Sequence, residues 1–231
     1  MLLCPRCTRL NPPTQELCEC GFAFRVEPAD LPAWFDEVRS ILEPAYLAAP
    51  TPWQQSGKSG SYEDWVRLRI PIAECVQQPG AFLDIGCANG FLLECLLDWT
   101  RRKAVTIEPY GLDMSEKLLT LAKLRLPDYG SHLFAANAWD WQPPRRFDYV
   151  RTELVYVPVN LRFAYLTRLL HKFLTTGGSL LVAHYRSRAE DLTRDWVDED
   201  LRALDLKVAG TTSGFDAAGQ ERTRVAIIRA E

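Results

Sequence analysis

The sequence predicts an α/β fold in which a seven-stranded, mostly parallel sheet carries helices on both faces and follows a small cysteine-rich module. Three observations support this prediction. Apolar stretches alternate with amphipathic helical stretches from about residue 60 to residue 231, which is typical of parallel sheets. Residues 82–94 read as a strand, a glycine-punctuated turn and a helix. Four of the seven cysteines lie within the first twenty residues.

Length and composition describe a globular protein. The 231 residues suffice for one α/β domain and a small appendage, and 47% of them are apolar. The formal net charge of −3 argues against the electropositive surface that drives non-specific binding to nucleic acid. The first residues lack a secretion signal, and no apolar stretch approaches the roughly 18 residues of a membrane span. We therefore expect a soluble, cytoplasmic protein that does not bind membranes.

The N-terminal cysteines form two close pairs, and their spacing predicts a zinc ribbon at residues 1–26. The predicted ligands are Cys4, Cys7, Cys18 and Cys20. Four thiolates from two such turns can surround Zn(II) tetrahedrally. One residue separates the second pair, where a ribbon usually has two, and an iron site and disulfides are the alternatives. Metal binding would supply the folding energy of so small a unit. We expect the ribbon to serve docking or recognition, for instance of a protein partner.

Residues 27–60 are expected to form a linker or lid with short helical pieces, because they contain five prolines. The stretch from Trp34 to Leu42 has the best helical spacing within them. A longer helix is predicted over residues 62–77, with Pro71 as a point of interruption. The third and largest domain then spans residues 61–231.

The strand–turn–helix at residues 82–94 is the most informative segment for function. Three residues separate Gly86 from Gly90, and Asp84 stands two positions before the first glycine. A dehydrogenase is disfavoured, because its turn would need the pattern G-x-G-x-x-G. The segment resembles motif I of the class I, Rossmann-like S-adenosylmethionine (SAM)-dependent methyltransferases, and a buried strand with an ordinary tight turn is the alternative. The resemblance implies cofactor contacts at Asp84, Gly86, Cys87, Ala88, Asn89 and Gly90.

Two later segments resemble further motifs of the same superfamily. Asp113 ends the second predicted strand, where a carboxylate can accept hydrogen bonds from both ribose hydroxyls, and Met114 would pack against adenine. Glu108 is a rival for the ribose contact, but the helix directly after Asp113 favours Asp113. Asn137 and Ala138 stand where the superfamily usually has an Asp-Ala pair that reads adenine, and a plain turn is the alternative for Asn137.

The remaining segments complete the plan of this superfamily. Apolar stretches predict strands at residues 81–85, 132–136, 147–150 and 179–185, and a terminal pair at residues 207–212 and 223–229. Helices are predicted at residues 90–99, 161–174 and 196–204. In many members the segment before the first strand covers the cofactor, which makes test candidates of Gln55, Ser56, Trp65 and Arg69. The resemblance covers residues 60–231 and implies the cofactor class but not the acceptor.

The acceptor is expected beyond the carboxyl ends of the fourth and fifth strands. This region holds Arg151, Thr152, Glu153, Tyr156, His184 and Tyr185. The candidate catalytic residues are Glu153, Tyr156 and His184, with Glu153 or His184 as the general base. A salt bridge is the alternative role for Glu153, and a structural histidine at a strand end is the alternative for His184.

Three hypotheses about function follow from the sequence. The first is methyl transfer from SAM to a small molecule, with structural zinc in the ribbon. The second is an RNA methyltransferase, acting on rRNA or tRNA, that uses the ribbon to dock its substrate. The third is a SAM-binding or interaction module without catalysis. The segment after the fourth strand contains neither the Asn/Asp-Pro-Pro-Tyr/Phe motif of enzymes that methylate amino groups of adenine or glutamine nor the Pro-Cys nucleophile of cytosine-C5 enzymes, so those two classes are disfavoured.

Overall fold

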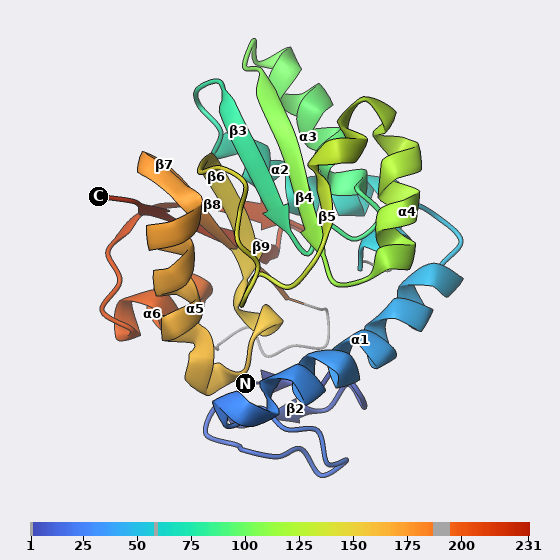
Figure 1. Cartoon of the computed structure of the whole chain (residues 1–231), viewed down its shortest axis with the longest axis vertical. Helices are drawn as coiled ribbons and strands as arrows, with labels where there is room; N and C mark the ends of the chain where they lie inside the picture. The colour runs from blue at the N-terminus through green and yellow to red at the C-terminus, as the bar shows by residue number, and fades with distance from the viewer. Residues whose placement is uncertain (1, 58–59, 187–194) are drawn as a thin grey trace.

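A seven-stranded sheet forms the centre of the computed structural model, which describes residues 2–57, 60–186 and 195–231 (Figure 1). Its strand order is β5-β4-β3-β6-β7-β9-β8. The strands are β3 (Gly80–Ile85), β4 (Ile107–Asp113), β5 (Leu133–Ala135), β6 (Phe147–Glu153), β7 (Leu174–Tyr185), β8 (Val208–Phe215) and β9 (Glu221–Arg229). β9 is antiparallel to both of its neighbours, and the other neighbouring pairs are parallel. The predicted mostly parallel sheet is therefore confirmed.

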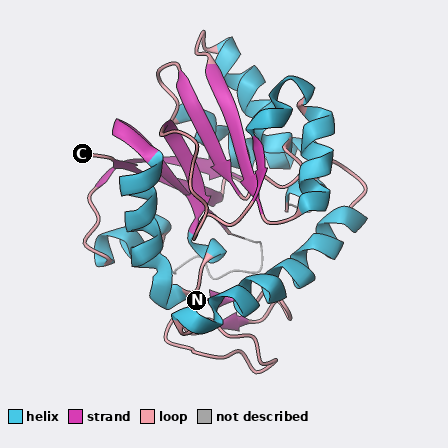
Figure 2. Cartoon of the chain, in the orientation of Figure 1, coloured by secondary structure: helices cyan, strands magenta, loops and turns pink. Residues whose placement is uncertain are grey.

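Helices cover both faces of this sheet, as predicted (Figure 2). They are α2 (Tyr62–Glu74), α3 (Phe91–Arg102), α4 (Glu116–Arg125), α5 (Arg162–Arg168) and α6 (Val197–Ala203). Successive side chains of a strand point to opposite faces. Phe82 and Tyr149 accordingly pack in one core with α2, α3 and α4, whereas Leu83 and Val150 pack in the other with α5 and α6. A π-helical turn at Leu169–Phe173 continues α5 as far as β7.

The segment predicted as a linker with short helical pieces is mostly one helix, α1 (Leu31–Ala48). The prediction gave its prolines too much weight. Leu31, Trp34 and Val38 lie on one buried stripe of α1, and this packing holds the helix together. Pro44 lies inside the helix on an exposed position, where water can reach the carbonyl that its missing N–H leaves without a partner. α2 likewise continues through Pro71, so the predicted interruption is not found there.

The N-terminal module is a small antiparallel unit that lies across α1 from the sheet (Figure 1). Its strands are β1 (Leu2–Leu3) and β2 (Leu10–Asn11). Phe22 and Phe24 are buried and belong to the same core as Leu154 and Val157 of the large domain. The module therefore shares its core with the sheet. In the described part of the chain, no helix is long and apolar enough to cross a bilayer.

Candidate functional site

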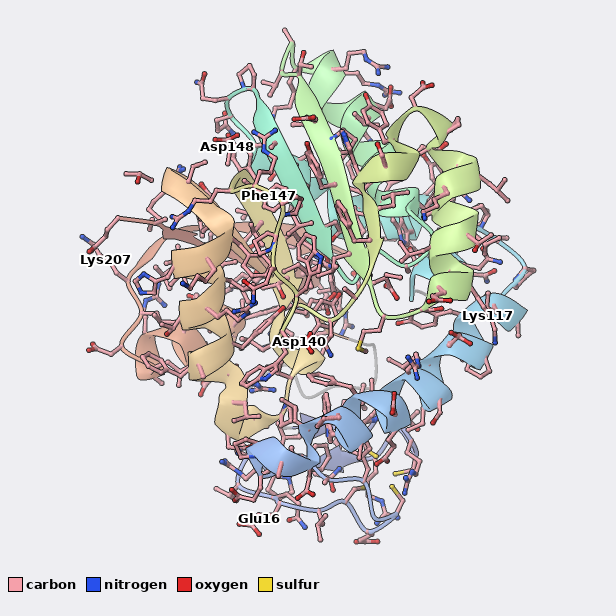
Figure 3. The ribbon with its side chains drawn as sticks, in the orientation of Figure 1. Glu16, Lys117, Asp140, Phe147, Asp148 and Lys207 are labelled. Atoms are coloured by element: carbon pink, nitrogen blue, oxygen red, sulfur yellow. The ribbon has the colours of Figure 1, made fainter. Side chains whose placement is uncertain are left out.

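The carboxyl ends of the central parallel strands meet at one edge of the sheet, and α1 crosses that edge (Figure 1). Asp84 lies near the end of β3, Asp113 ends β4 and Glu153 ends β6. Figure 3 shows Phe147 and Asp148, at the start of β6, at the end of the sheet away from α1. The edge beside α1 is where ligands bind in open α/β folds.

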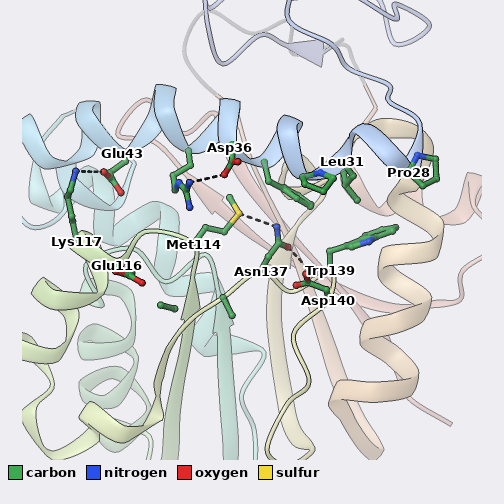
Figure 4. A pocket seen from close by; sticks show the side chains of 15 residues that line it. Pro28, Leu31, Asp36, Glu43, Met114, Glu116, Lys117, Asn137, Trp139 and Asp140 are labelled. Atoms are coloured by element: carbon green, nitrogen blue, oxygen red, sulfur yellow. Dashed lines mark hydrogen bonds and ion pairs between the residues drawn. The ribbon is translucent and has the colours of Figure 1, made fainter.

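A cavity of about 890 Å³ separates this edge from the N-terminal segment. Asp84, Gly86, Asp113 and Glu153 line it from the sheet. Trp34 and Tyr46 of α1 line it from the other side, together with Leu2, Phe22 and Phe24 of the module. The sequence analysis did not predict that α1 and the module line this cavity opposite the sheet, because nothing in the cysteine-rich segment indicates which surface it covers. A neighbouring hollow of about 800 Å³ runs along α1 beside Met114 and Asn137 (Figure 4).

Asp84 is a buried carboxylate at the floor of the cavity, 1% exposed. Its Oδ1 lies 3.2 Å from Nη1 of Arg151, which is also buried. Its Oδ2 has no hydrogen-bond partner among the described residues. Burial raises the pKa of Asp84 to about 6, although the charge of Arg151 acts in the opposite direction. One oxygen of Asp84 is thus left to receive a donor from a ligand.

Arg151 connects Asp84 to two of the candidate catalytic residues. Its Nη1 donates to the hydroxyl of Tyr156 at 2.9 Å, and its Nη2 forms an ion pair with Glu153. The Tyr156 hydroxyl in turn donates to Oε1 of Glu153 at 2.9 Å. Burial raises the pKa of Tyr156 well above its ordinary value, so this phenol keeps its proton. The salt-bridge role foreseen for Glu153 is thus present, but within the cavity wall.

The turn after β3 is tight and is covered by Tyr156. Gly86 and Ala88 have positive φ angles of 74° and 48°. A β-carbon added at Gly86 would lie 2.6 Å from the ring of Tyr156, so only glycine allows this contact. Gly86, Cys87 and Ala88 line the cavity, whereas Asn89 and Gly90 are not among its lining residues.

Asp113 joins the tip of β4 to this turn. Its carboxylate accepts from the backbone N–H groups of Ala88 and Ser115, each at 2.8 Å. Burial raises its pKa, while these two N–H groups act to lower it. The rival carboxylate, Glu108, lies at the start of β4 and bonds Arg145 at 2.8 Å, away from the carboxyl edge.

α1 is anchored beside Asp113 by one carboxylate. Glu43 accepts from the hydroxyl of Ser115 at 2.7 Å. It also forms an ion pair with Lys117 at 2.8 Å (Figure 4). These bonds lower the pKa of Glu43, with Lys117 as the larger cause and Ser115 as the next. α1 is therefore held over the site.

The side chains of Met114 and Asn137 point toward one another along the second hollow (Figure 4). Nδ2 of Asn137 donates to the sulfur of Met114 at 3.2 Å. Oδ1 of Asn137 accepts from the backbone N–H of Trp139 at 2.9 Å, which is the plain turn considered as the alternative. Ala138 is buried and lines the main cavity.

The other residues singled out from the sequence divide into cavity-lining and internal side chains. His184 lines the cavity, and its ring packs edge-on against Trp196, with 5.3 Å between the ring centroids. Arg69 also lines it; this residue is 6% exposed, and its guanidinium lies 3.5 Å above the ring of Tyr185. Nη1 of Arg69 has no hydrogen-bond partner among the described residues. Thr152, in contrast, is buried and bonds Tyr165 at 2.7 Å.

The four N-terminal cysteines converge as predicted. Their sulfur atoms all lie within 4.8 Å of one another, and the pairs Cys4–Cys20 and Cys7–Cys18 are each 3.5 Å apart. A tetrahedron of thiolates around zinc places its sulfurs about 3.8 Å apart, so the donor set fits this metal. All four are free thiols. Burial raises the pKa of Cys4 to about 12, whereas the backbone N–H of Cys20 lowers that of Cys18 to about 6.

A scan against protein-family models and a search of curated proteins found no match for the sequence. Solved structures do match. The N-methyltransferase NodS from Bradyrhizobium japonicum WM9, bound to S-adenosylhomocysteine, is 19% identical, with a TM-score of 0.58 over 82% of this chain and 96% of its own. A 1,6-didemethyltoxoflavin-N1-methyltransferase from Burkholderia thailandensis is 14% identical, with a TM-score of 0.63 over 89% of this chain and 92% of its own.

An rRNA methylase from Streptococcus thermophilus also matches, at 17% identity and a TM-score of 0.50 over 75% of this chain and 100% of its own. These likenesses concern the fold. The chain therefore has the Rossmann-like fold of the class I SAM-dependent methyltransferases.

Proposed function

We propose that this protein is an enzyme that transfers a methyl group from SAM to a small-molecule acceptor. The observation that carries the proposal is the pair of carboxylates, Asp84 and Asp113, that face one cavity from the ends of two adjacent strands. The fold shared with structures that hold S-adenosylhomocysteine supports the same cofactor. In this proposal residues 1–26 are a zinc ribbon, residues 27–60 a lid and residues 61–231 the catalytic domain. A cytoplasmic location suits it, because zinc-binding thiols must stay reduced.

The polar groups at the edge match the charges of SAM. The free oxygen of Asp84 suits the cofactor's ammonium group, and Asp113 suits its ribose hydroxyls. The buried guanidinium of Arg69 would receive the cofactor's carboxylate, which would satisfy its Nη1. Met114, Asn137 and Ala138 would then flank the adenine, with the backbone N–H of Ala138 as the donor that reads the ring.

Methyl transfer requires alignment of a nucleophile, exclusion of water and a destination for the acceptor's proton. The acceptor atom bonds the methyl carbon as the carbon–sulfur bond breaks, and the sulfur keeps that electron pair. We assign the proton to Glu153, which Tyr156 and Arg151 hold at the cavity wall. His184, on the same wall, is the second candidate base.

The size and lining of the cavity favour a small acceptor over RNA. Phe22 and Phe24 of the module and Trp34 of α1 line the same cavity of about 890 Å³ as Glu153. The net charge of −3 also disfavours a polyanionic substrate. The rRNA methylase among the similar structures keeps RNA as the alternative to test.

Calorimetric titration with SAM and, separately, NADH tests the cofactor. We expect micromolar binding of SAM and none of NADH. The Asp84→Ala, Asp113→Ala double variant should lose at least about 100-fold in SAM affinity, because each carboxylate makes a charge-assisted bond. Glu108→Ala is the matched control, since this acid lies at the other end of β4. Absence of SAM binding to the folded protein would overturn the proposal.

A screen for S-adenosylhomocysteine formation then tests the acceptor. Turnover with small molecules supports the proposal, and turnover with RNA alone replaces it by the RNA alternative. In that case RNA binding should weaken steeply with salt and disappear when Cys4 and Cys7 become serine. SAM binding without turnover on any acceptor would leave a non-catalytic module.

A further inference from the structure

Among the described residues, the N-terminal module (residues 1–26) bonds α1 through Ala23 and Trp34, and it also bonds the segment that follows β6. The backbone N–H of Val159 donates to the carbonyl of Phe24 at 2.9 Å. The side chain of Asn160 donates to the carbonyl of Val26 at 2.9 Å and accepts from its N–H at 3.3 Å. Three hydrogen bonds thus connect residues 24–26 to residues 159–160, one between backbone groups and two through the side-chain amide of Asn160.

The position of residues 24–26 depends on the second cysteine turn. The N–H of Cys18 donates to the carbonyl of Phe22 at 2.8 Å, and the N–H of Gly21 donates to the carbonyl of Cys18 at 2.8 Å. Phe22 packs against Phe24 with 5.6 Å between their ring centroids. A unit of this size relies on bound metal to hold such turns in place. Metal binding would therefore order residues 24–26, which bond residues 159–160.

The segment after β6 that the module contacts also contains Tyr156, which lies three residues before Val159. Tyr156 lies on Gly86 and bonds both Arg151 and Glu153. Between Tyr156 and the docked residues, Val157 is buried in the core that the module shares. A displacement of residues 157–160 therefore moves the phenol that covers the turn after β3.

We propose that the metal-loaded module positions Tyr156 over the turn after β3, with Phe24 and Asn160 as positioning residues. Loss of the metal would then loosen the part of the cavity wall that holds Tyr156 and Glu153. The module then belongs to the active site and is not a remote docking unit. The identity of the site rests on the proposed function, but the physical coupling does not.

Hydrogen exchange of the full chain under reducing conditions tests the coupling. Zinc-loaded protein is compared with protein stripped by a chelator and with stripped protein to which zinc is returned. We expect exchange in residues 154–161 to rise at least tenfold on stripping and to recover with zinc. Exchange in α3 should change far less, because its buried apolar side chains belong to the other core.

Asn160→Ala separates the connection from metal binding itself. This variant should keep one zinc per chain yet exchange in residues 154–161 like the stripped protein, and its SAM affinity should fall about tenfold. Gln142→Ala is the control, because it also removes an exposed amide whose only described bond is local.

Three outcomes would overturn the inference. In the first, stripping speeds exchange only in residues 1–26. In the second, exchange in α3 rises as much as in residues 154–161, which means general destabilisation. In the third, Asn160→Ala behaves as the parent protein. Coupling without SAM binding would refute the proposed function alone, and SAM binding without coupling would refute this inference alone.

Discussion

At the residue scale, Asp84 is a buried cavity-lining carboxylate, and one of its oxygens has no hydrogen-bond partner among the described residues. An aspartate in the unfolded chain has a pKa near 3.9, whereas in the folded protein that of Asp84 is about 6. Between these values the folded state holds a proton that the unfolded chain has released. Asp84 therefore lowers stability as the pH rises from about 4 to 6, and this loss is complete above that window. Such a carboxylate gains from binding a cation.

SAM affinity should accordingly depend on pH through Asp84. The cofactor's ammonium group favours the ionised carboxylate, so affinity falls as the pH drops below about 6, by up to about tenfold per pH unit. Arg151 lowers and Glu153 and Asp113 raise this pKa, and all three remain in the control variant. Titration calorimetry between pH 5 and 8 measures the profile. Asp84→Asn should bind more weakly and flatten it, and a flat profile in the parent protein would contradict the assignment.

A second residue-scale prediction concerns the contact between Gly86 and Tyr156. Gly86→Ala should destabilise the protein by about 2–4 kcal/mol, since a β-carbon is strained at a φ of 74° and collides with the phenol ring. Gly219→Ala is the control, because Gly219 has a φ of 78° and a β-carbon there meets nothing within 4 Å. It should lose only about 1 kcal/mol.

Urea unfolding of both variants measures the difference. The double variant Gly86→Ala, Tyr156→Ala should recover the part of the loss that is due to collision, with a coupling free energy above about 1 kcal/mol. Additive losses would show that the two side chains do not compete for space.

At the scale of elements, the local signals in the sequence were sufficient for strands and turns. The run from Ala81 to Ile85 is continuously apolar apart from Asp84, and a buried parallel strand reads this way. Of α1, only the stretch from Trp34 to Leu42 was predicted as the best helical piece, and its full length was missed because the prolines were taken as interruptions. Packing of Trp34 and its neighbours outweighs the loss of one hydrogen bond. Asn89, whose contact with the cofactor stays a prediction, has a side chain that bonds the segment before α2.

Asn89 makes a testable connection between elements. It is fully buried; its Nδ2 donates to the carbonyl of Pro52 at 3.0 Å and to Gln55 at 3.1 Å, and its Oδ1 accepts from the N–H of Phe91 at 3.2 Å. Asn89→Ala should lower the free energy of unfolding by about 2–3 kcal/mol, because three bonds are lost at a buried position. Gln55→Ala should cost about 1 kcal/mol. Urea denaturation compares them, and equal losses would mean that Asn89 contributes no more than its bond to Gln55.

At the scale of the whole molecule, the sequence predicted the sheet and the cluster of four cysteines but not the N-terminal cover of the cavity. Spacing within a few residues brings Cys4 near Cys7, and such local patterns are readable. The bond between Val26 and Asn160 joins residues 134 positions apart, and neither residue carries a pattern that indicates the other. The central position of Arg151 was equally hidden, since its partners come from three strands and a loop.

The core shared by the module and the large domain predicts how the whole protein unfolds. Because Phe22 and Phe24 pack in one core with Leu154 and Val157, zinc release and loss of helix should occur in one cooperative transition. Circular dichroism and a chromogenic zinc indicator, recorded on the same heating ramp, measure the two events.

Cys18→Ser should lose zinc and lower the midpoint of unfolding by several degrees. Cys75→Ser is the matched control, since Cys75 is a buried thiol that bonds Pro71 and Thr212 outside the cluster, and a serine keeps those bonds. Zinc release well below the unfolding midpoint, with ellipticity unchanged, would mean that the module unfolds independently and that its metal does not stabilise the shared core.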